Sequence, residues 1–169
     1  MTKYVALLRA VNVAGAGKLP MAHLKSICLA AGFTGVETYI ASGNAIFESD
    51  APASEIKAKL ETRLIAYAGK PVGVIVRTAA QMQAVLCRNP FPEAEPKHTY
   101  VIFLDEPAPA DALLHAKGRD GERMHLSGWE IFVHYPMGMG RSKLKIPAAK
   151  WGTARNMNTV TKLAEIASK

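Results

Sequence analysis

The order of the hydrophobic patterns in residues 4–77 limits the fold of this chain more than any other feature of its sequence. Apolar runs typical of strands alternate with segments that repeat apolar residues at helical spacing, and turn-forming residues separate them. The order is β-α-β-β-α-β, which predicts an antiparallel sheet with two helices on one face, the ferredoxin-like arrangement. We expect strands at 4–13, 36–40, 45–48 and 72–76, and helices from Pro20 to about Gly32 and over 54–68.

The second half of the chain has a related order of patterns. Thr78 and Gln81 have the spacing of a capping box, which predicts a third helix that ends before the proline-rich stretch 89–96. The order that follows is β-α-β-β-α, which predicts a degenerate copy of the first half. Its expected strands are 99–104, 123–126 and 130–135, and its expected helices are 110–117 and a last one from Thr159. We therefore expect an α+β protein of two packed α/β sandwich halves: residues 1–88, a linker over 89–98, and residues 99–169.

Composition excludes several classes of protein. The hydrophobic share of 49% and the charged share of 21% are those of a globular chain rather than a disordered one. The longest nearly apolar stretch, 4–17, is broken by Arg9 and Asn12, so we expect no membrane span. The start of the chain has no signal-peptide pattern, which predicts a cytoplasmic protein. Cys28 and Cys87 both lie in helical patterns, which argues against a disulfide framework.

Positive charge is concentrated at the C-terminus. The whole chain has a formal net charge of +7, and residues 141–169 contain seven basic side chains and one acidic side chain. A solvated basic surface and a binding site for an anion both explain this excess. The anion site is favoured by the loop from Gly138 to Lys143, where two glycines leave backbone amides free to turn inward and Arg141, Ser142 and Lys143 supply donors.

Two further segments are candidates for anion binding. Gly15-Ala16-Gly17-Lys18 lies between a strand and a helix, but Asn12 stands where a P-loop needs its first glycine and Leu19 where it needs Ser or Thr. These departures argue against a nucleotide triphosphatase, although Lys18 near a helix start still favours an anion. The segment 151–159 is rich in hydrogen-bonding side chains and includes Arg155, Asn156 and Asn158. Alternatively, Asn156 or Asn158 caps the last helix and Trp151 packs in the core.

Catalytic signatures are otherwise missing. The five histidines have no metal-ligand spacing, and the chain has no Gly-x-Ser-x-Gly motif. An approach of His125 and His134 across the second predicted hairpin is one alternative, and surface positions, which are more frequent for histidine, are the other. We therefore assign no catalytic residue, no metal site and no cofactor.

Several motifs together resemble one bacterial family, the domain of unknown function 1697 family. The resemblance covers essentially the whole chain and rests on Leu8-Arg9-Ala10-Val11-Asn12-Val13, Tyr39-Ile40-Ala41-Ser42-Gly43-Asn44, Gly140-Arg141-Ser142-Lys143-Leu144 and 153–160. Ala10, Ala14, Ala41 and Met157 depart from the family pattern. The family has no assigned function, so the resemblance implies only a set of recurring polar residues. They are Arg9, Asn12, Ser42, Asn44, Arg141, Ser142, Lys143, Arg155, Asn156 and Asn158.

These observations favour an anion-binding module whose partner is nucleic acid or a small anionic ligand. Two alternatives remain open: an enzyme acting on a small phosphorylated or carboxylated metabolite, and a structural or interaction protein without catalysis. The sequence does not set the oligomeric state. Two spatial expectations follow. Arg9, Asn12, Ser42 and Asn44 face one another in the first half, and Arg141, Lys143 and Arg155 form one basic surface.

Overall fold

The computed structural model describes residues 1–12 and 18–169, and these divide into two compact units. The first unit comprises Met1–Gln83 and Leu163–Lys169, and the second comprises Ala84–Lys162. The linker that the sequence indicates at 89–98 stays a prediction. Within the described parts of the chain, no helix combines the length and the apolar character needed to cross a bilayer.

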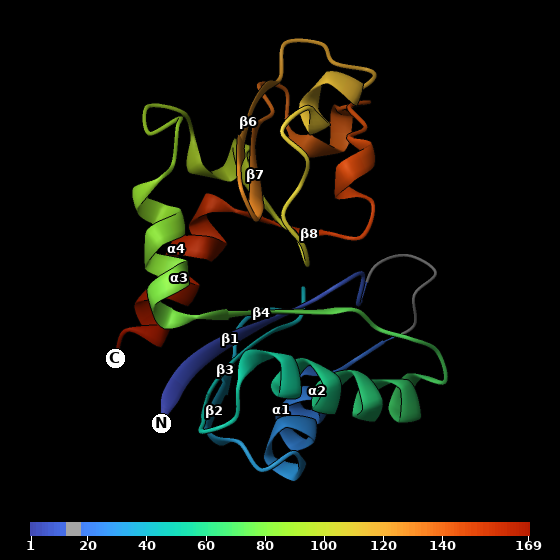
Figure 1. Cartoon of the computed structure of the whole chain (residues 1–169), viewed down its shortest axis with the longest axis vertical. Coiled ribbons are helices and arrows are strands. Elements are labelled where there is room, and N and C mark those ends of the chain that lie inside the picture. Colours follow the sequence, from blue (N-terminus) through green and yellow to red (C-terminus); the bar gives the residue numbers. More distant parts are fainter. Residues whose placement is uncertain (13–17) are drawn as a thin grey trace. The chain divides into compact units, whose positions relative to one another are not determined.

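The first unit is built on a four-stranded antiparallel sheet in the order β2-β3-β1-β4 (Figure 1). This confirms the predicted succession of elements in residues 4–77. The strands pair along their length, and β1 is central, with β3 on one side and β4 on the other. The elements are β1 (Thr2–Leu8), α1 (Met21–Ala30), β2 (Thr34–Thr38), β3 (Asn44–Ser49), α2 (Ala53–Ala68) and β4 (Val74–Thr78).

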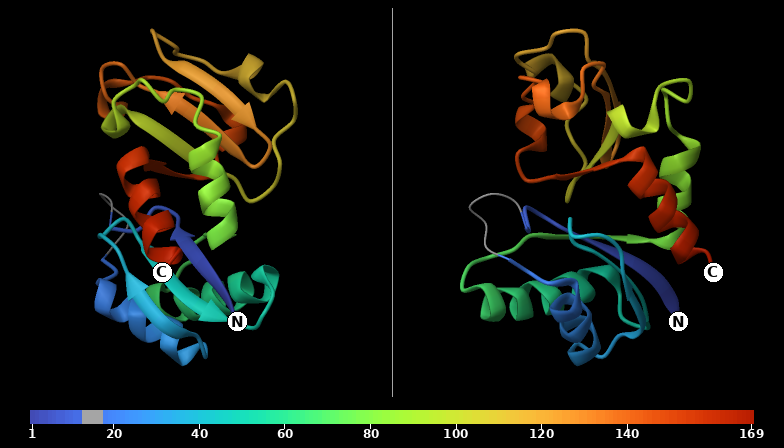
Figure 2. Two further views of the ribbon diagram at one scale, coloured as in Figure 1. Left: turned by 90° about the vertical axis from the view of Figure 1, so that its left-hand side faces the viewer. Right: turned by 180° about the vertical axis from the view of Figure 1, so that it is seen from behind.

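Helices α1 and α2 cover the same face of this sheet, as the rotated views in Figure 2 show. Ile56, Leu60 and Leu64 repeat every four residues along α2, so they form one apolar stripe, and all three are fully buried. They share a core with side chains of the sheet, including Phe47 of β3. The ring of Phe47 stacks on Phe33 with centroids 4.3 Å apart. The helical spacing in the sequence therefore located this core correctly.

Strand β1 ends five residues before the predicted limit. Ala10 and Asn12 have φ angles of 54° and 55°, a left-handed conformation that no strand continues through. The last sheet-like hydrogen bonds of this strand's backbone run from the Leu8 amide to the Gly43 carbonyl and from the Arg9 amide to the Gly73 carbonyl, both at 2.9 Å. Val13, the predicted end of the strand, lies outside the described residues.

The second unit contains a second four-stranded antiparallel sheet, in the order β6-β7-β5-β8. Counted in chain order within each unit, the strand order is the same in both sheets. Helices α3 (Ala79–Cys87) and α4 (Met157–Ala167) follow the last strand of the first and second sheet, respectively, and both have residues in the two units. The strands are β5 (Thr99–Phe103), β6 (Arg123–Ser127), β7 (Glu130–His134) and β8 (Thr153–Asn156).

Two predictions for the second half were wrong. Only a short 3-10 helix, η2 (Ala112–His115), occupies the predicted helix 110–117. Strand β8 was missed because its four residues, Thr-Ala-Arg-Asn, include no large apolar side chain, and buried Thr153 and Arg155 alternate with half-buried residues. Three further 3-10 helices are η1 (Pro96–His98), η3 (Met139–Arg141) and η4 (Pro147–Ala149).

The capping predictions are confirmed at both α3 and α4. The Thr78 amide donates to Gln81 Oε1 at 2.8 Å, and the Gln81 amide donates to Thr78 Oγ1 at 3.1 Å. At the start of α4, the Thr159 amide donates to Asn156 Oδ1 at 2.9 Å. The cap therefore accounts for Asn156, one of the predicted binding residues.

Candidate functional site

The predicted polar residues of the first unit meet where β1 ends, and they bind one another and the backbone. Asn12 Nδ2 donates to the carbonyls of Leu19 and Ala41, each at 2.8 Å, while Asn12 Oδ1 accepts the Leu19 amide at 2.6 Å. Asn44 is fully buried, and its Nδ2 donates to the Tyr39 carbonyl at 2.8 Å and to Ser42 Oγ at 2.9 Å. The expected contact of Ser42 with Asn44 is confirmed, and Asn12 bonds to Ala41 next to Ser42. That the Arg9 side chain faces them stays a prediction.

The function of this group is structural in the first instance. The Asn12 and Asn44 amide groups bond to backbone groups in the segments between the strands, at Leu19, Ala41 and Tyr39. The Arg9 backbone joins the same region through Gly73, and its side chain is half-buried. Lys18 is exposed, and the predicted glycine-rich residues 15–17 lie outside the described residues.

Arg155 is buried, and this corrects the expectation that it shares one basic surface with Arg141 and Lys143. Only 6% of Arg155 is exposed, whereas Arg141 and Lys143 are exposed. Its Nη1 donates to Thr153 Oγ1 at 2.7 Å and to the Ala154 carbonyl at 2.9 Å. Burial lowers the pKa of Arg155 to about 10. A guanidinium held this way stabilises the end of β8 and presents little of its charge to solvent.

Trp151 is exposed, which corrects the alternative that it packs in the core. The side chain is 67% exposed, and Lys150 Nζ lies 5.1 Å from the centre of its ring. Asn158 is also exposed, on the first turn of α4.

The segment Gly138–Lys143 is a compact turn. Its residues form η3, in which the Arg141 amide donates to the Gly138 carbonyl and the Ser142 amide to the Met139 carbonyl. The Leu144 amide is also engaged, by Ser142 Oγ at 3.1 Å. Three amides of this region, those of Arg141, Ser142 and Leu144, are thus engaged within the turn, and a backbone cradle for an anion stays a prediction.

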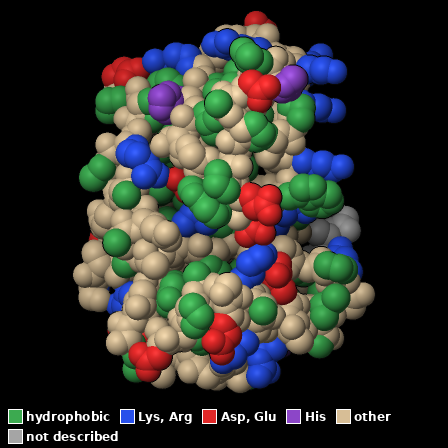
Figure 3. All heavy atoms as spheres, in the orientation of Figure 1, with side chains coloured by type: hydrophobic (Ala, Val, Ile, Leu, Met, Phe, Trp, Pro, Cys, Tyr) green, Lys and Arg blue, Asp and Glu red, His purple; other side chains and the backbone are tan. Residues whose placement is uncertain are grey.

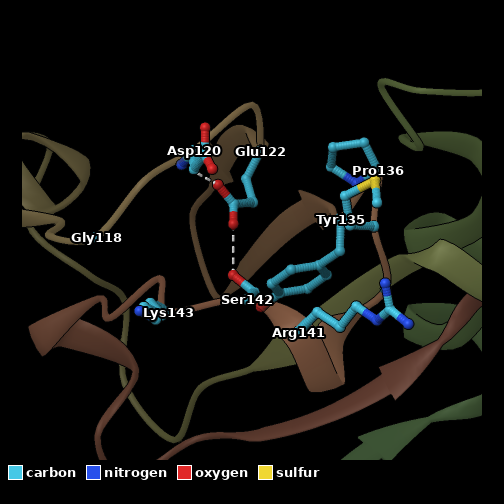
Figure 4. Close-up of a pocket in the computed structure, with 10 residues that line it drawn as sticks. Gly118, Asp120, Glu122, Tyr135, Pro136, Arg141, Ser142 and Lys143 are labelled. Carbon is cyan, nitrogen blue, oxygen red and sulfur yellow. Dashed lines mark hydrogen bonds between the residues drawn. The ribbon is translucent and has the colours of Figure 1, made fainter.

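A cavity of about 180 Å³ lies beside this turn, and a carboxylate occupies its wall (Figure 4). Glu122 accepts hydrogen bonds from the Ser142 hydroxyl and from the Asp120 amide, and the Ser142 and Glu122 side chains point toward each other. These bonds, that from Ser142 first, hold the pKa of Glu122 below its usual value. Glu122 is therefore ionised at neutral pH. It accepts the hydrogen bond of the Ser142 hydroxyl, one of the donors that the sequence suggested for an external anion.

Tyr135 lines the same cavity. Burial, with smaller effects of Glu122 and Tyr100, raises the pKa of the Tyr135 phenol, so the side chain is neutral in the physiological range. Its ring packs edge-on against Tyr100 with centroids 5.5 Å apart. Arg141 also lines the cavity, but its side chain extends away from Glu122 in Figure 4.

Four exposed cations lie on the segments around this cavity, and two of them, Arg141 and Lys143, contribute to its lining. We call Lys117, Arg141, Lys143 and Lys145 the cationic cluster. Lys117 and Lys145 are directly opposite each other in an isolated antiparallel bridge, with amide-to-carbonyl distances of 2.9 and 2.8 Å. Lys143 is two residues before Lys145 and lies close to this bridge: a Cβ on Gly118, which has a φ of 75°, would lie 2.2 Å from the Lys143 carbonyl oxygen. Only glycine fits there.

All four side chains of the cationic cluster are exposed. In Figure 3, Lys and Arg side chains gather along the upper and right-hand margin, where Figure 1 places the segments between β5 and β8. Within residues 1–12 and 18–169, none of the four forms an ion pair with an acidic side chain. The excess of basic residues after residue 140 indicates from the sequence that Lys145 belongs to a basic surface. Lys117 belongs to the cationic cluster through pairing with a distant segment, which no local pattern predicts.

The histidines form no site in the part of the chain that the structure describes. The register of the β6–β7 hairpin pairs His134 with Arg123 and His125 with Phe132, so the two histidines are diagonal neighbours on one face of the hairpin and are not directly opposite each other. His125 is exposed and His134 is half-buried. No group of three or more His, Cys, Asp or Glu side chains is placed there to hold a metal ion.

Comparison with known proteins identifies the family. The chain is similar over 98% of its length, and over 98% of the other chain, to a solved structure, the conserved bacterial protein SP0830 from Streptococcus pneumoniae, with 25% identity and a TM-score of 0.80. No curated protein matches. The family model described as protein of unknown function (DUF1697) matches residues 1–132, which contain the motifs at 8–13 and 39–44 but not those after residue 139. The chain thus belongs to the DUF1697 family, as its motifs led us to expect.

Proposed function

We propose that this protein binds a phosphate-bearing polyanion through the cationic cluster of its second unit. The observation that carries the proposal is the Lys117–Lys145 bridge, in which two lysines occupy directly opposed positions of an antiparallel pair. Opposed residues in a hydrogen-bonded pair of this kind have Cα atoms about 5.5 Å apart and side chains on the same face. The two exposed lysine side chains therefore leave the backbone on the same face of the bridge.

Such a pair carries an electrostatic cost in the absence of an anion. Like charges directly opposite each other on a sheet are destabilising, and an opposite charge at one position reverses the sign. The described carboxylates do not provide it, because Glu122 is bound by Ser142 and Asp120, and the lysines have no acidic partner among the described residues. A bound phosphate group removes the repulsion, so part of the binding free energy is built into the unliganded protein.

The arrangement favours a polymer of phosphates over a single small anion. The neighbouring cavity has an ionised carboxylate in its wall, and this disfavours a second negative charge inside it. The four cations are exposed, so each is strongly hydrated and binds a single ion weakly. Several phosphates linked in one chain release several counterions together, which is the usual source of affinity at such a surface.

We also propose that the first unit is ferredoxin-like and the second a degenerate copy of it. The strand order β2-β3-β1-β4 and the two helices on one face support the first part. The registers support the second. Arg77 pairs with Val5 in the first sheet, and Arg155 pairs with Val101 in the second, each one residue before the end of the last strand.

The test of polyanion binding is a salt titration with the full chain. The affinities for a linear polyphosphate and for a short DNA duplex are measured by competition with a labelled oligonucleotide. Log affinity should fall linearly with log salt, by about 0.7 to 0.9 for each phosphate neutralised. The double variant Lys143→Ala/Lys145→Ala should bind more weakly and lower the slope by about one for each lysine that no longer neutralises a phosphate.

A matched control removes the same charge elsewhere. Lys25 and Lys70 are exposed lysines of the first unit, and Lys25→Ala/Lys70→Ala changes the net charge equally. This control should retain the wild-type slope. Equal losses of affinity in the two double variants would mean that net charge and not the cationic cluster attracts the anion. Absence of binding to either probe at about 50 mM salt, where screening is weak, would overturn the proposal.

A further inference from the structure

We infer that the polyanion is a single-stranded nucleic acid and that Trp151 stacks on one of its bases. This inference rests on the proposed function and adds the class of ligand. The segment after Lys145 leads directly through η4 to Lys150 and Trp151, so an exposed indole follows the cationic cluster along the same stretch of chain. Trp151 is 67% exposed although it is the largest kind of apolar side chain.

The backbone around Trp151 is held in a fixed turn. The amides of Ala149, Lys150 and Gly152 donate in succession to the carbonyls of Ile146, Pro147 and Ala149, at 2.9, 3.2 and 3.0 Å. Gly152 then passes so close to β5 that a Cβ at this position would lie 2.8 Å from the Phe103 carbonyl oxygen. The indole is therefore presented by a segment that is anchored on both sides.

The surroundings of the ring suit a base and its phosphate. Lys150 Nζ lies 5.1 Å from the ring centre, so the indole already contacts a cation through its electron-rich face. A nucleotide suits both features: its base provides a flat surface for the exposed part of the ring, and its phosphate suits the cationic cluster. Aromatic stacking combined with a cationic path for the backbone is the usual basis of sequence-tolerant binding to single strands.

The same chemistry argues against duplex as the preferred ligand. Bases in a duplex are stacked on one another and paired, so their faces are closed to an indole, and unstacking one costs a few kcal/mol. Polyphosphate lacks bases altogether. The cationic cluster alone would bind all three polyanions according to their charge, whereas Trp151 adds affinity only for the single strand.

The chain provides a clean spectroscopic test because it contains only two tryptophans. The other one, Trp129, is 47% exposed in the β6–β7 hairpin. In Trp129→Phe, the remaining fluorescence comes from Trp151. We expect oligo(dT) or oligo(U) to quench it on binding, and we expect polyphosphate to bind without comparable quenching. Comparison of the two oligonucleotides shows whether DNA or RNA is preferred.

Affinity measurements complete the test. Trp151→Ala should weaken binding of oligo(dT) or oligo(U) by about tenfold, and Trp151→Phe should retain most of it, because one stacked base contributes about that much. Binding of polyphosphate should not change in either variant, and Trp129→Phe is the matched control. Thermal unfolding of each variant verifies that the fold is retained.

The possible results separate the two proposals. If polyphosphate and oligonucleotides bind with equal charge-matched affinity and Trp151→Ala changes neither, the cationic cluster binds polyanions and the stacking inference is wrong. If duplex binds more tightly than the single strand, the inference is also wrong. If no probe binds, the proposed function fails together with the inference.

Discussion

The two units share a strand order but cover their sheets differently, and the difference separates scaffold from candidate site. In the first unit, α1 and α2 cover one face of the sheet with continuous apolar stripes. In the second, short 3-10 helices and extended segments pack on the corresponding core, through partly buried residues such as Leu113, Leu144 and Ala148. These thin segments bring Lys117, Lys143 and Lys145 to the surface.

A pair of corresponding arginines shows which features belong to the common scaffold. Arg77 and Arg155 are each 6% exposed, and each donates from Nη1 to the carbonyl of the preceding residue, at 3.2 and 2.9 Å. Because Arg77 and Arg155 have the same register position in sheets of the same strand order, we expect them to stabilise the sheets. The Lys117–Lys145 bridge joins segments of the second unit outside its named strands. A function specific to the second unit is therefore better sought at this bridge.

The largest expected effect on stability compares a helix that covers the first sheet, α2, with a 3-10 helix that packs on the core of the second, η2. Leu60→Ala removes a fully buried side chain from α2 and should lower the free energy of unfolding by about 2 to 5 kcal/mol. Leu113→Ala in η2 removes a partly buried side chain and should cost less than half as much, because the site is already partly hydrated. Urea denaturation measures both. Equal losses would mean that η2 covers its core as completely as α2 does.

The next effect concerns polar loop residues. Asn44→Ala removes donors to the Tyr39 carbonyl and to Ser42 Oγ at a fully buried position, so we expect a loss of about 1 to 3 kcal/mol. Asn158→Ala, at an exposed position, should change stability by less than about 0.5 kcal/mol. The same denaturation experiment serves both variants. If Asn44→Ala changes the free energy of unfolding no more than Asn158→Ala does, the hydrogen bonds of Asn44 contribute little to stability. Asn44 would then again be a candidate binding residue.

These examples show how far the sequence predicts the molecule. The periodicity of α2 and the capping box at Thr78 depend on neighbours a few residues apart, so they were predictable. Strand β8 and the Lys117–Lys145 bridge depend on pairing with distant segments. Their residues are mostly polar, so the sequence pattern indicates neither burial nor proximity. Arg155 was misplaced for the same reason, because a basic residue suggests the surface until its strand is known to be buried.

The third effect depends on pH and belongs to the second unit. The pKa of Glu122 is lowered in the folded protein, so its hydrogen bonds stabilise the fold above the ordinary glutamate pKa of 4.5 and lose that effect as pH falls through the lower folded value. Wild type should therefore be less stable at acid pH than at neutral pH, and Glu122→Gln should show a smaller difference. Urea midpoints at the two pH values measure it.

A control for this experiment is Glu106→Gln, which changes an exposed carboxylate between β5 and β6. It should leave the wild-type difference between the two pH values in place. If Glu122→Gln keeps the full difference as well, the carboxylate is not the group that Ser142 and the Asp120 amide stabilise, and the cavity wall would be free to accept an anion.

The smallest effect on stability tests the electrostatic basis of the proposed function. Lys117→Glu places a carboxylate directly opposite Lys145, which exchanges a repulsive cross-strand pair for an attractive one. We expect the free energy of unfolding to rise by about 0.2 to 1 kcal/mol. The same substitution should weaken binding of polyphosphate and oligonucleotides, because the new carboxylate neutralises the cation that the anion contacts.

A binding surface predicts that Lys117→Glu raises stability and lowers affinity together, whereas a merely solvated surface predicts no loss of affinity. Lys25→Glu makes the same change of charge away from any such bridge in the first unit, so it should give neither the gain in stability nor the specific loss of affinity. The gain from Lys117→Glu should shrink at high salt, where the attraction between exposed charges is screened. A Lys117→Glu variant that is no more stable than wild type at low salt would show that the two lysines do not repel each other, and an anion would then have no strain to relieve there.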